Sequence, residues 1–399
     1  MKIAAVIAEY NPFHLGHEYM LTKVRNMGYD GIIAVMSGNF VQRGDAAISD
    51  KRSRAKMAIS SGVDLVIELP LPYAVASAQK FAFGAVKIIK ACGIVDAIAF
   101  GSECGDVELI KCTAEIIKND ISDELKGQLD KGITFAAARE KAVASIDKKA
   151  AKILKSPNDT LAVEYVTALG DSEIKPIAIK RIGAAHDGDA IDGFASASQI
   201  RQILLLGDIK GAAKYMPTSA AEILKSEIES ANAPVTLNRA ENAIISYLRR
   251  LSVEDIKNLP DVSEGLENRI FNAIRKGTSL DEIINKIKSK RYTMARIRRI
   301  LLSAYLGVSR DTVLAPVPYI RILGANQKGR QILKIIKKTA TLPIITRTKE
   351  VNTLDKQAVN MFSLEGDAAD LYWLMSPTNK PCGKDMTDPI VMIKKSEET

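Results

Sequence analysis

The chain contains 399 residues, of which 47% are hydrophobic and 26% are charged, a composition typical of a globular protein. It has no apolar run near the roughly 20 residues that a membrane helix needs, and its N-terminus lacks a small-residue cleavage site, so we expect a cytoplasmic protein with no membrane span. Its four cysteines show no CxxC spacing, which argues against disulfides and structural zinc.

Short apolar runs alternate with longer mixed segments through the first 200 residues. The predicted strands are residues 2–8, 31–37, 64–70, 97–102 and 173–181. The predicted helices are residues 16–27, 49–60, 77–91, 156–170 and 196–207. Strands so rich in Val, Ile and Ala are buried on both faces, and the intervening helices imply parallel pairing. The pattern predicts an α/β fold with a doubly wound parallel sheet, whose ligands bind beyond the carboxyl ends of the strands.

The second half of the chain differs in both pattern and charge. Helical patterns dominate from about residue 207 to about residue 340, and a strand-like segment (342–348) and a helix (354–374) follow. Residues 1–200 hold 24 Lys and Arg against 25 Asp and Glu, whereas residues 201–399 hold 32 against 22. Within residues 286–349 the count is 16 basic residues to one acidic residue. Such a one-signed stretch attracts polyanions, so we expect this half to contact nucleic acid.

The segment EYNPFHLGHEY, residues 9–19, lies between the first predicted strand and the first predicted helix. It holds two of the chain's three histidines, His14 and His17, on either side of Gly16. A helix start offers unpaired backbone N–H groups and the positive end of the helix dipole. Imidazole N–H groups can donate to phosphate oxygens, Gly16 allows a close approach, and Asn11 adds a neutral donor. The segment therefore predicts a cradle for a nucleoside triphosphate.

Two other interpretations of the histidine pair remain open. The two side chains can simply cap the helix or pack against the core. They can also bind zinc, but the segment has no cysteine and the only other histidine is His186, whereas a zinc site needs three or four protein ligands. We therefore expect no metal site formed by protein residues.

Several segments resemble a known family. HLGH after the first strand is similar to the H-x-G-H signature of the nucleotidyltransferase superfamily. The segments AEYNPFHLGHEY, MSGNFVQRGDAAISDKRSRAKMA, DLVIELPLPYAVASAQKFA, FGSE, SPNDTLAVEY and ASASQIR, in this order, resemble the bacterial tRNA(Met) cytidine acetate ligases. The resemblance spans most of residues 1–205 and continues more weakly around residues 290–302. It implies an ATP-dependent ligase that activates acetate as acetyl-adenylate and then acetylates N4 of the wobble cytidine in elongator tRNA(Met).

The resemblance also implies domains and site residues. Residues 1–205 would form an ATP-binding, nucleotidyltransferase-like domain, and residues 206–399 a mainly helical tRNA-binding domain with a mixed C-terminal segment. The catalytic residues would be His14, His17 and Arg201. The ATP-binding residues would be Ile7, Ala8, Glu9, Tyr10, Asn11, Pro12, Phe13, His14, Leu15, Gly16, His17, Glu18, Tyr19, Met20, Gly101, Asn158, Arg181 and Ser198. The tRNA-binding residues would be Lys290, Arg291, Arg296, Arg298 and Arg299.

One part of the motif departs from the superfamily. Where the superfamily often reads I-S-S-T-x-I-R, this chain has Ala197 and Ser198 in place of Ser and Thr, so one hydroxyl is missing. Residues 37–44, with Lys51, Arg52 and Arg54 nearby, would form a mobile loop that closes over acetate or the tRNA base.

The implied ligands are ATP as a substrate, Mg²⁺ bound with it, acetate and elongator tRNA(Met), with no membrane and no protein partner. Two alternative functions remain. A small-molecule adenylyltransferase would use the same histidines and arginine, but it has no need of a basic second half. A non-catalytic RNA-binding protein would keep nucleotide as a structural ligand and retain tRNA without turning over ATP.

Overall fold

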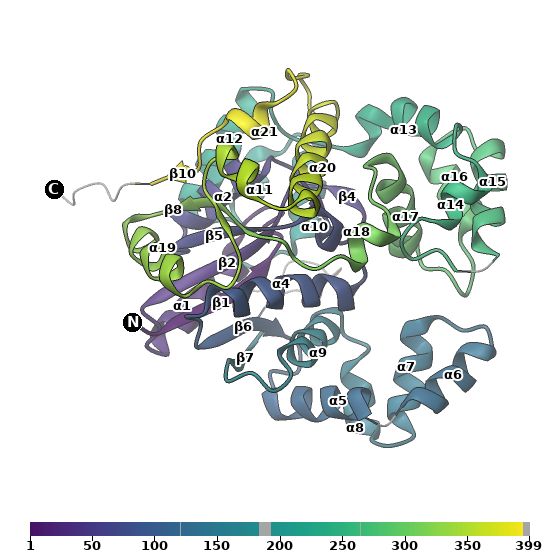
Figure 1. Ribbon diagram of the computed structural model, residues 1–399, viewed down its shortest axis with the longest axis horizontal. Coiled ribbons are helices and arrows are strands. Elements are labelled where there is room, and N and C mark those ends of the chain that lie inside the picture. Colours follow the sequence, from purple (N-terminus) through teal and green to yellow (C-terminus); the bar gives the residue numbers. More distant parts are fainter. Residues whose placement is uncertain (120, 183–192, 264, 394–399) are drawn as a thin grey trace.

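A mostly parallel sheet forms the centre of the protein, in a computed structural model that describes residues 1–119, 121–182, 193–263 and 265–393 (Figure 1). Its strands are β1 (Ile3–Ala8), β2 (Gly31–Ser37), β5 (Leu65–Leu69), β6 (Ala97–Ser102), β7 (Lys175–Lys180), β8 (Ile320–Ala325), β9 (Ile344–Ile345) and β10 (Val391–Met392). The strand order is β10-β8-β5-β2-β1-β6-β7, with β9 also paired to β8. The five strands predicted in the first 200 residues are β1, β2, β5, β6 and β7, and they pair in parallel as expected.

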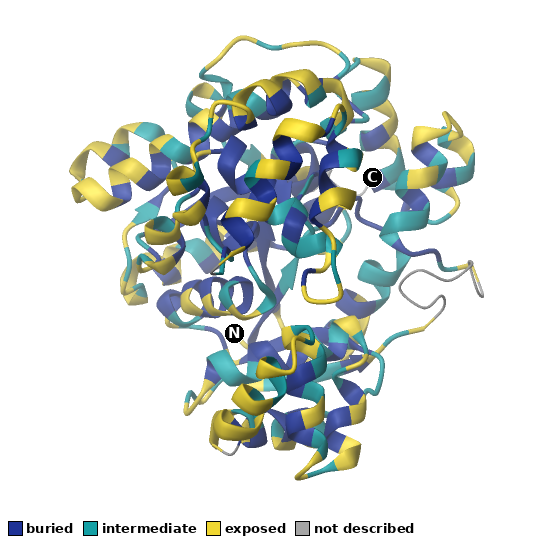
Figure 2. Cartoon of the chain, turned by 90° about the vertical axis from the view of Figure 1, so that its right-hand side faces the viewer, coloured by how far each residue is buried: buried dark blue, intermediate teal, exposed yellow. Residues whose placement is uncertain are grey.

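Helices cover both faces of the sheet, because successive side chains of a strand point to opposite sides. On β1, Ile3 and Ala5 face one side, whereas Ala4 and Val6 face the other. The first face is covered by α4 (Ala78–Cys92), α5 (Val107–Asn119), α9 (Pro157–Leu169) and α19 (Gln327–Thr339). The second face is covered by α1 (Leu15–Asn26), α2 (Lys51–Ser60), α10 (Ala197–Leu205), α11 (Ile209–Ala213) and α12 (Thr218–Glu229). Figure 2 shows the buried sheet between these layers.

Strand addition changes direction at β1. From β1 the chain adds β2 and β5 on one side, and later returns to add β6 and β7 on the other side. Loops that leave the carboxyl ends of β1 and β6 therefore diverge and open a crevice, which is the usual ligand position in such a sheet. His14 follows β1, Gly101 lies near the end of β6 and Arg181 follows β7, so the fold brings these three positions to one edge.

Two further groups of helices lie beyond the sheet. One consists of α6 (Ser122–Asp130), α7 (Phe135–Ala144) and α8 (Lys148–Ile153), which share a small core with α5. The other consists of η1 (Leu237–Ala240), α13 (Glu241–Leu248), α14 (Val253–Lys257), α15 (Leu266–Lys276), α16 (Leu280–Ile287), α17 (Met294–Tyr305) and α18 (Arg310–Leu314). Its large core also includes Phe40, Leu71 and Tyr372 from other parts of the chain. This second group is the helical region predicted after residue 207.

The C-terminal part of the chain returns to the sheet. Strand β8 lies antiparallel to β5, in a stretch where the sequence predicts helices, so that prediction is wrong at residues 320–325. The run IRILGA is short and wholly buried, and periodicity alone does not separate such a strand from a buried helix. The remaining helices are α3 (Leu71–Ala74), η2 (Thr348–Thr353), α20 (Lys356–Trp373) and α21 (Lys384–Thr387). The sheet therefore contains strands from both sides of residue 205, and the domain division there stays a prediction.

Buried ion pairs hold the C-terminal part against the first half of the chain. Lys51 Nζ lies 2.7 Å from a Glu68 carboxylate oxygen and 2.9 Å from Asp385 Oδ2. Arg321 lies 3.2 Å from Glu68 and 2.9 Å from Asp385 in the same cluster. The Lys51 ammonium is consequently engaged within the protein. Its backbone N–H donates to Asn39 Oδ1 at 2.8 Å, so Lys51 lies beside residues 37–44 as expected.

Arg52 and Arg54 are also engaged in internal contacts. Arg52 donates to the carbonyl oxygens of Pro389 and Asp385, at 2.8 and 2.9 Å. Arg54 is fully buried and donates to the carbonyls of Ser49 and Glu9, at 2.9 and 2.5 Å, and to those of Ser37 and Gly38. Neither guanidinium is therefore available to close over a ligand. Among the described residues, none of the helices has the length and apolar character needed to cross a membrane.

Candidate active site

A cavity of about 440 Å³ opens at the carboxyl ends of β1, β6 and β7. The predicted ATP-binding residues that line it are Ile7, Ala8, Glu9, Tyr10, Asn11, His14, Gly16, His17, Tyr19, Met20, Gly101, Asn158 and Arg181. Its described lining also contains Arg43, Lys155 and Lys180. Together with Arg181 these make four basic residues, against one acidic residue, Glu9. A cavity with this excess of positive charge favours a polyanion such as a triphosphate.

The other predicted ATP-binding residues are not in the described lining of the cavity; they are Pro12, Phe13, Leu15, Glu18 and Ser198. Phe13 is fully buried, with its ring centroid 5.3 Å from that of His17. The backbone N–H of Leu15 donates to the carbonyl of Tyr215 at 2.9 Å. Ser198 Oγ accepts from Arg201 at 3.2 Å, which turns this hydroxyl toward the arginine.

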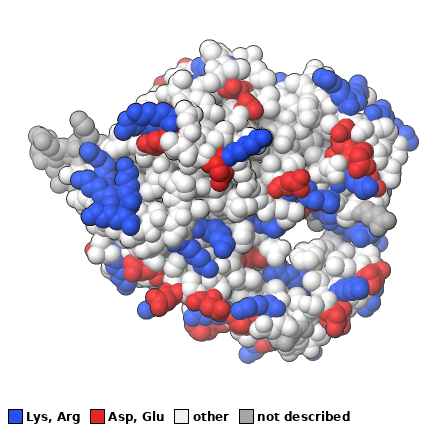
Figure 3. Space-filling model, viewed as in Figure 1, with Lys and Arg blue, Asp and Glu red and all other residues white. Residues whose placement is uncertain are grey.

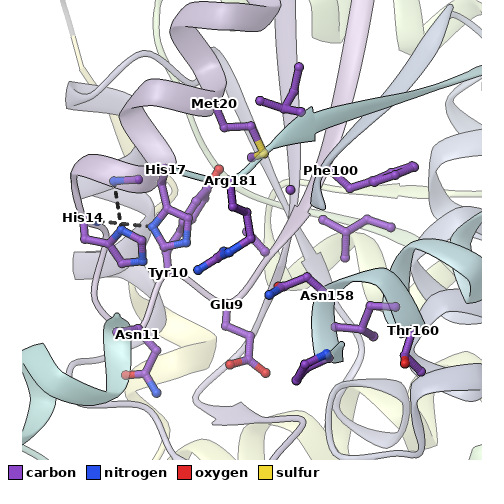
Figure 4. Close-up of a pocket in the computed structure, with 18 of the residues that line it drawn as sticks. Glu9, Tyr10, Asn11, His14, His17, Met20, Phe100, Asn158, Thr160 and Arg181 are labelled. Atoms are coloured by element: carbon purple, nitrogen blue, oxygen red, sulfur yellow. Dashed lines mark hydrogen bonds between the residues drawn. The ribbon is translucent and has the colours of Figure 1, made fainter. Parts of the chain in front are cut away.

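His14 and His17 cap the start of α1 (Figure 4). His14 is the N-cap residue, and its Nδ1 accepts the backbone N–H of Gly16 at 3.1 Å. Nδ1 of His17 accepts the backbone N–H of His14 at 3.2 Å. Because each Nδ1 is an acceptor, each neutral ring carries its proton on Nε2. The pair therefore offers two Nε2–H donors to a ligand.

Both histidines are uncharged in the folded protein. Burial, together with the nearby guanidinium groups of Arg181 and Arg201, lowers the pKa of His14 to about 3. Burial, then His14, then Arg181 hold the pKa of His17 well below its usual value. The two rings stack with centroids 3.7 Å apart, an arrangement that two neutral imidazoles tolerate and two imidazolium ions would resist. Neutral N–H donation is thus the chemistry that the two rings provide.

The start of α1 differs from expectation in one respect. The sequence predicts that unpaired N–H groups of this helix contribute to anion binding. In the structure, Leu15 donates to Tyr215, Gly16 donates to the ring of His14, and His17 donates to the carbonyl of His14. These first N–H groups already have protein partners, so the imidazoles and the nearby cations remain as the donors for phosphate.

Arg181 and Asn158 approach the histidines from other elements. Figure 4 shows Arg181 extending toward the two rings and Asn158 at the start of α9 on the facing wall. Asn158 Nδ2 donates to Glu103 Oε1 at 2.6 Å, which fixes the orientation of the amide. A Cβ on Gly101 would lie 3.4 Å from Arg181 Cγ, so glycine leaves the arginine its space.

An apolar wall of the cavity was missing from the predicted site. It contains Phe81, Phe100, Leu161 and Tyr165, and the rings of Phe100 and Tyr165 lie 6.0 Å apart. Apolar walls with a few polar groups are typical of nucleoside sites. Helical spacing gave a usable signal, because Leu161 and Tyr165 lie three and seven residues after Asn158 on one face of a helix.

Arg201 lies beside the cavity rather than in its described lining. Its Nη1 donates to the carbonyl of Asn11 at 2.8 Å, so it holds the loop that follows β1. Arg43 and Gln42, at the tip of the hairpin formed by β3 (Phe40–Val41) and β4 (Asp45–Ala46), line the cavity. Residues 37–44, expected to be a mobile loop, thus form part of a hairpin whose Phe40 and Val41 are buried.

The five predicted tRNA-binding residues fall into two groups. Lys290 and Arg291 are exposed, before the start of α17. Arg296 donates to the carbonyl of Asp261 at 2.7 Å, and Arg299 lies 3.4 Å from the Asp261 carboxylate. Arg298, on the same helix, is half-buried.

The basic stretch also divides into two surfaces. Figure 3 shows a dense group of Lys and Arg over α19, far from α17. Lys328 of α19 donates to the carbonyl of Asp30, just before β2, so the helix begins at the amino edge of the sheet, opposite the cavity. Figure 3 also shows a hollow below α17, with Lys and Arg side chains along it. The Lys and Arg side chains of α19 therefore lie at the edge of the sheet away from the cavity.

Within the described residues, no three His, Cys, Asp or Glu side chains cluster as metal ligands would. His186, which the sequence analysis considered as a third nitrogen ligand, lies outside the described residues. The Nδ1 atoms of His14 and His17 are already hydrogen-bonded to backbone N–H groups, which leaves them unsuited to ligate zinc.

A parallel sheet with a histidine pair and a cationic cavity at its carboxyl edge defines a nucleotidyltransferase-like protein. In agreement, residues 1–386 match the family described as HIGH Nucleotidyl Transferase. The chain is 41% identical to the tRNA(Met) cytidine acetate ligase of Thermoanaerobacter sp. (strain X514) over 98% of this chain and 100% of that protein. It is 39% identical to the tRNA(Met) cytidine acetate ligase of Clostridium perfringens (strain ATCC 13124), with the same coverage of both chains.

Solved structures give the same result. The crystal structure of apo Thermotoga maritima TmcAL matches with a TM-score of 0.94 and 34% identity, over 99% of this chain and 100% of that chain. The structure of the same protein bound with alpha-thio ATP matches with a TM-score of 0.93. The chain therefore belongs to the tRNA(Met) cytidine acetate ligase family of the HIGH nucleotidyl transferases.

Proposed function

We propose that the protein uses ATP to activate acetate as acetyl-adenylate and transfers the acetyl group to N4 of the wobble cytidine of elongator tRNA(Met). The observation that carries this proposal is the cavity in which two neutral imidazoles and several cations surround one end of an apolar slot. Such a slot suits a nucleoside, and its charged end suits the triphosphate. The relatives that share the fold over their whole length carry the name of this activity.

In the first step acetate attacks the α-phosphorus of ATP and pyrophosphate leaves. Acetate is already a nucleophile at neutral pH, so the protein has to position it and offset charge on the phosphates. His14 and His17 would donate Nε2–H to the phosphate chain, and Arg181 would supply a guanidinium fork. Arg201 would act by holding the Asn11 carbonyl and so the histidine loop.

Mg²⁺ would bind with the triphosphate and neutralise part of its charge, and Glu9 is the acidic residue of the described lining that can help to hold it. Glu9 is itself well positioned. Its Oε1 accepts the backbone N–H of Gln42 at 2.9 Å, and its carbonyl accepts from Arg54 at 2.5 Å. These contacts tie the end of β1 to the hairpin and to α2.

In the second step N4 of the cytidine attacks the acyl carbon and AMP leaves. An anticodon base has to be splayed out of its loop to reach a cavity, as single-stranded RNA bases can be. The tRNA would lie along the basic surface at Lys290 and Arg291. We further propose that the reaction takes place in the cytoplasm, where charged and uncharged tRNA are found.

One experiment tests the proposal against both alternatives. The protein is incubated with labelled ATP, acetate and an elongator tRNA(Met) transcript, with a transcript carrying uridine at the wobble position as the matched control. Acetyl transfer to the first transcript alone supports the ligase. A labelled dinucleotide-like product with no RNA acylation would support an adenylyltransferase. Retention of tRNA with no pyrophosphate release under any acyl donor would support a non-catalytic RNA-binding protein.

A further inference from the structure

A second cavity, of about 210 Å³, lies where the β3–β4 hairpin meets the helical region. We refer to it as the interface cavity. Its walls are apolar, with Leu237 and Leu302 among them, and its polar groups include Asp45, Arg201, Asn238 and Arg298. Of these six residues, Asn238 is exposed and the other five are buried or half-buried. The combination of apolar walls and a few polar groups suits a nucleobase.

The interface cavity adjoins the nucleotide cavity. Successive residues of one hairpin turn face the two spaces, since Gln42 and Arg43 line the nucleotide cavity whereas Gly44 and Asp45 line the interface cavity. Arg201 forms a second part of the common wall, because it lines the interface cavity and donates to the carbonyl of Asn11 at 2.8 Å. A group bound in the interface cavity therefore lies within one hairpin turn of the nucleotide cavity.

Packing fixes the turn that separates the cavities. Gly44 has a φ of 76°, and a Cβ there would lie 2.5 Å from the backbone nitrogen of Arg299 in α17. The hairpin turn thus rests directly on the backbone of α17. This contact places Asp45 from the first half of the chain beside Arg298 from the basic helix, so the interface cavity forms only where the two parts of the chain meet.

Asp45 has capacity to accept a further hydrogen bond. Among the described residues, its carboxylate accepts one, from the backbone N–H of its neighbour Ala46 at 2.8 Å. Burial raises the pKa of this carboxyl above its ordinary value, although Arg201 and Arg298 act in the opposite direction. The carboxylate is half-buried, and it can accept a further hydrogen bond from a ligand N–H group.

The polar groups match one edge of cytosine. That edge presents an amine donor at N4 beside the acceptors N3 and O2, and a carboxylate is a usual partner for the N4 amine. Asp45 can accept from N4, and the guanidinium of Arg298 or the amide of Asn238 can donate to N3 and O2. Uracil has a carbonyl oxygen in place of the N4 amine, which would face the Asp45 carboxylate without a donor.

We propose that the interface cavity holds the nucleobase that receives the acyl group, and that Asp45 accepts the proton which its exocyclic amine loses. This inference rests on the proposed function. The N4 nitrogen forms a bond to the acyl carbon, and the bond from that carbon to the AMP oxygen breaks. AMP leaves with the bonding electrons, and one of the two N4 protons passes to Asp45 and then to solvent. The N4 lone pair is delocalised into the ring, so removing this proton assists the attack.

The test uses the full chain and the substitution Asp45→Asn. Two steps are measured separately: acetate-dependent exchange between pyrophosphate and ATP, and single-turnover acetyl transfer from enzyme-bound acetyl-adenylate to elongator tRNA(Met). We expect exchange within about twofold of the unchanged protein and transfer slower by about 10²-fold or more, the usual contribution of a general base. In the unchanged protein the transfer rate should rise with pH as one carboxyl group ionises, and this rise should be absent in Asp45→Asn.

A second variant tests the cavity itself. Leu302→Trp fills the interface cavity, and we expect normal exchange with a strongly reduced rate of transfer. Transfer at the unchanged rate in Asp45→Asn, or equal loss of exchange and transfer in both variants, would overturn the proposal. A failure of the proposed function looks different, because the unchanged protein would then show no acetate-dependent exchange or no transfer to RNA.

Discussion

The imidazole of His17 accepts the backbone N–H of His14, at 3.2 Å, while the His14 ring accepts the N–H of Gly16 and stacks on the His17 ring at a centroid distance of 3.7 Å. This reciprocal cap assigns the same tautomer to both rings and turns each Nε2–H away from the backbone. One turn of chain thus both starts α1 and provides two neutral donors at the carboxyl edge of the sheet. The H-x-G-H spacing allows the His17 ring to reach the backbone N–H of His14, and the His14 ring to reach that of Gly16.

The first prediction concerns these two donors. His14→Ala and His17→Ala should each lower acetate-dependent pyrophosphate exchange by about 10²-fold or more, comparable to the loss of one donor from an oxyanion hole. His14→Asn separates capping from phosphate contact, because asparagine is a good N-cap residue but has no Nε2–H. We expect His14→Asn to retain the melting temperature better than His14→Ala and still to lose exchange. Exchange near the unchanged rate in both alanine variants would remove the histidines from the mechanism.

A second prediction follows from the lowered pKa of His14. Burial, together with the nearby guanidinium groups, lowers the pKa to about 3, below the value of 6.5 for an ordinary histidine. Between these two pH values the unfolded chain binds a proton that the folded protein does not, so stability falls as the pH drops below about 6.5. One such histidine changes the free energy of unfolding by at most about 1.4 kcal/mol per pH unit. In urea unfolding at pH 7, 6 and 5, His14→Asn should therefore lose less stability than the unchanged protein. Parallel profiles for the two proteins would contradict this assignment.

The fold of the first half could be predicted because its signals are local. The strands of residues 1–200 are continuous apolar runs, and Ser196 caps α10 through a capping box with Gln199, a pattern that is visible in the sequence. The position of the site followed from the topology rule for parallel sheets. The motif residues therefore gather at one edge as expected, since each follows or ends a strand.

The parts that could not be predicted depend on distant contacts. Strand β8 joins the sheet through β5, more than 250 residues earlier in the chain, and nothing local marks its short buried run as a strand. Arg296 and Arg299 read as surface cations in a basic run, yet both contact Asp261. A run of basic residues in a sequence indicates a positive electrostatic potential at the surface. Which of those cations instead contact partners inside the protein depends on the fold.

The third prediction concerns Gly16. A Cβ at this position would lie 2.9 Å from His14 Cε1 and 3.1 Å from Nδ1, so Gly16→Ala has to displace the ring. We expect a loss of exchange comparable to that in His14→Ala, although alanine is otherwise favourable in a helix by about 1 kcal/mol. Gly127→Ala in α6 is the matched control, because no atom lies within 4 Å of its added Cβ. Equal activity of the two variants would show that the ring position is not critical.

The fourth prediction concerns tRNA binding. Lys290→Ala with Arg291→Ala should weaken binding of elongator tRNA(Met) and lower the salt dependence of log K by about two units, since each phosphate contact releases about one counterion. Acetyl-adenylate formation should be unchanged. The matched control is Lys334→Ala with Lys337→Ala, which removes two exposed cations of α19 at the far edge of the sheet. Equal weakening by both pairs would indicate that overall charge, and not the surface near α17, holds the RNA.

The final prediction separates structural cations from ligand-binding ones. Lys51→Ala would leave Glu68 and Asp385 buried with less compensation, and breaking a buried pair in this way usually costs about 3–5 kcal/mol of unfolding free energy. Lys286→Ala is the control, because its pair with Glu282 is exposed and such pairs contribute about 1 kcal/mol or less. Urea unfolding measures both. At temperatures where Lys51→Ala stays folded, its Michaelis constants for ATP and acetate should match those of the unchanged protein, because the side chain lies in the ion cluster that joins α2 to the C-terminal part. A selective rise in the constant for acetate with no loss of stability would instead place Lys51 at the substrate.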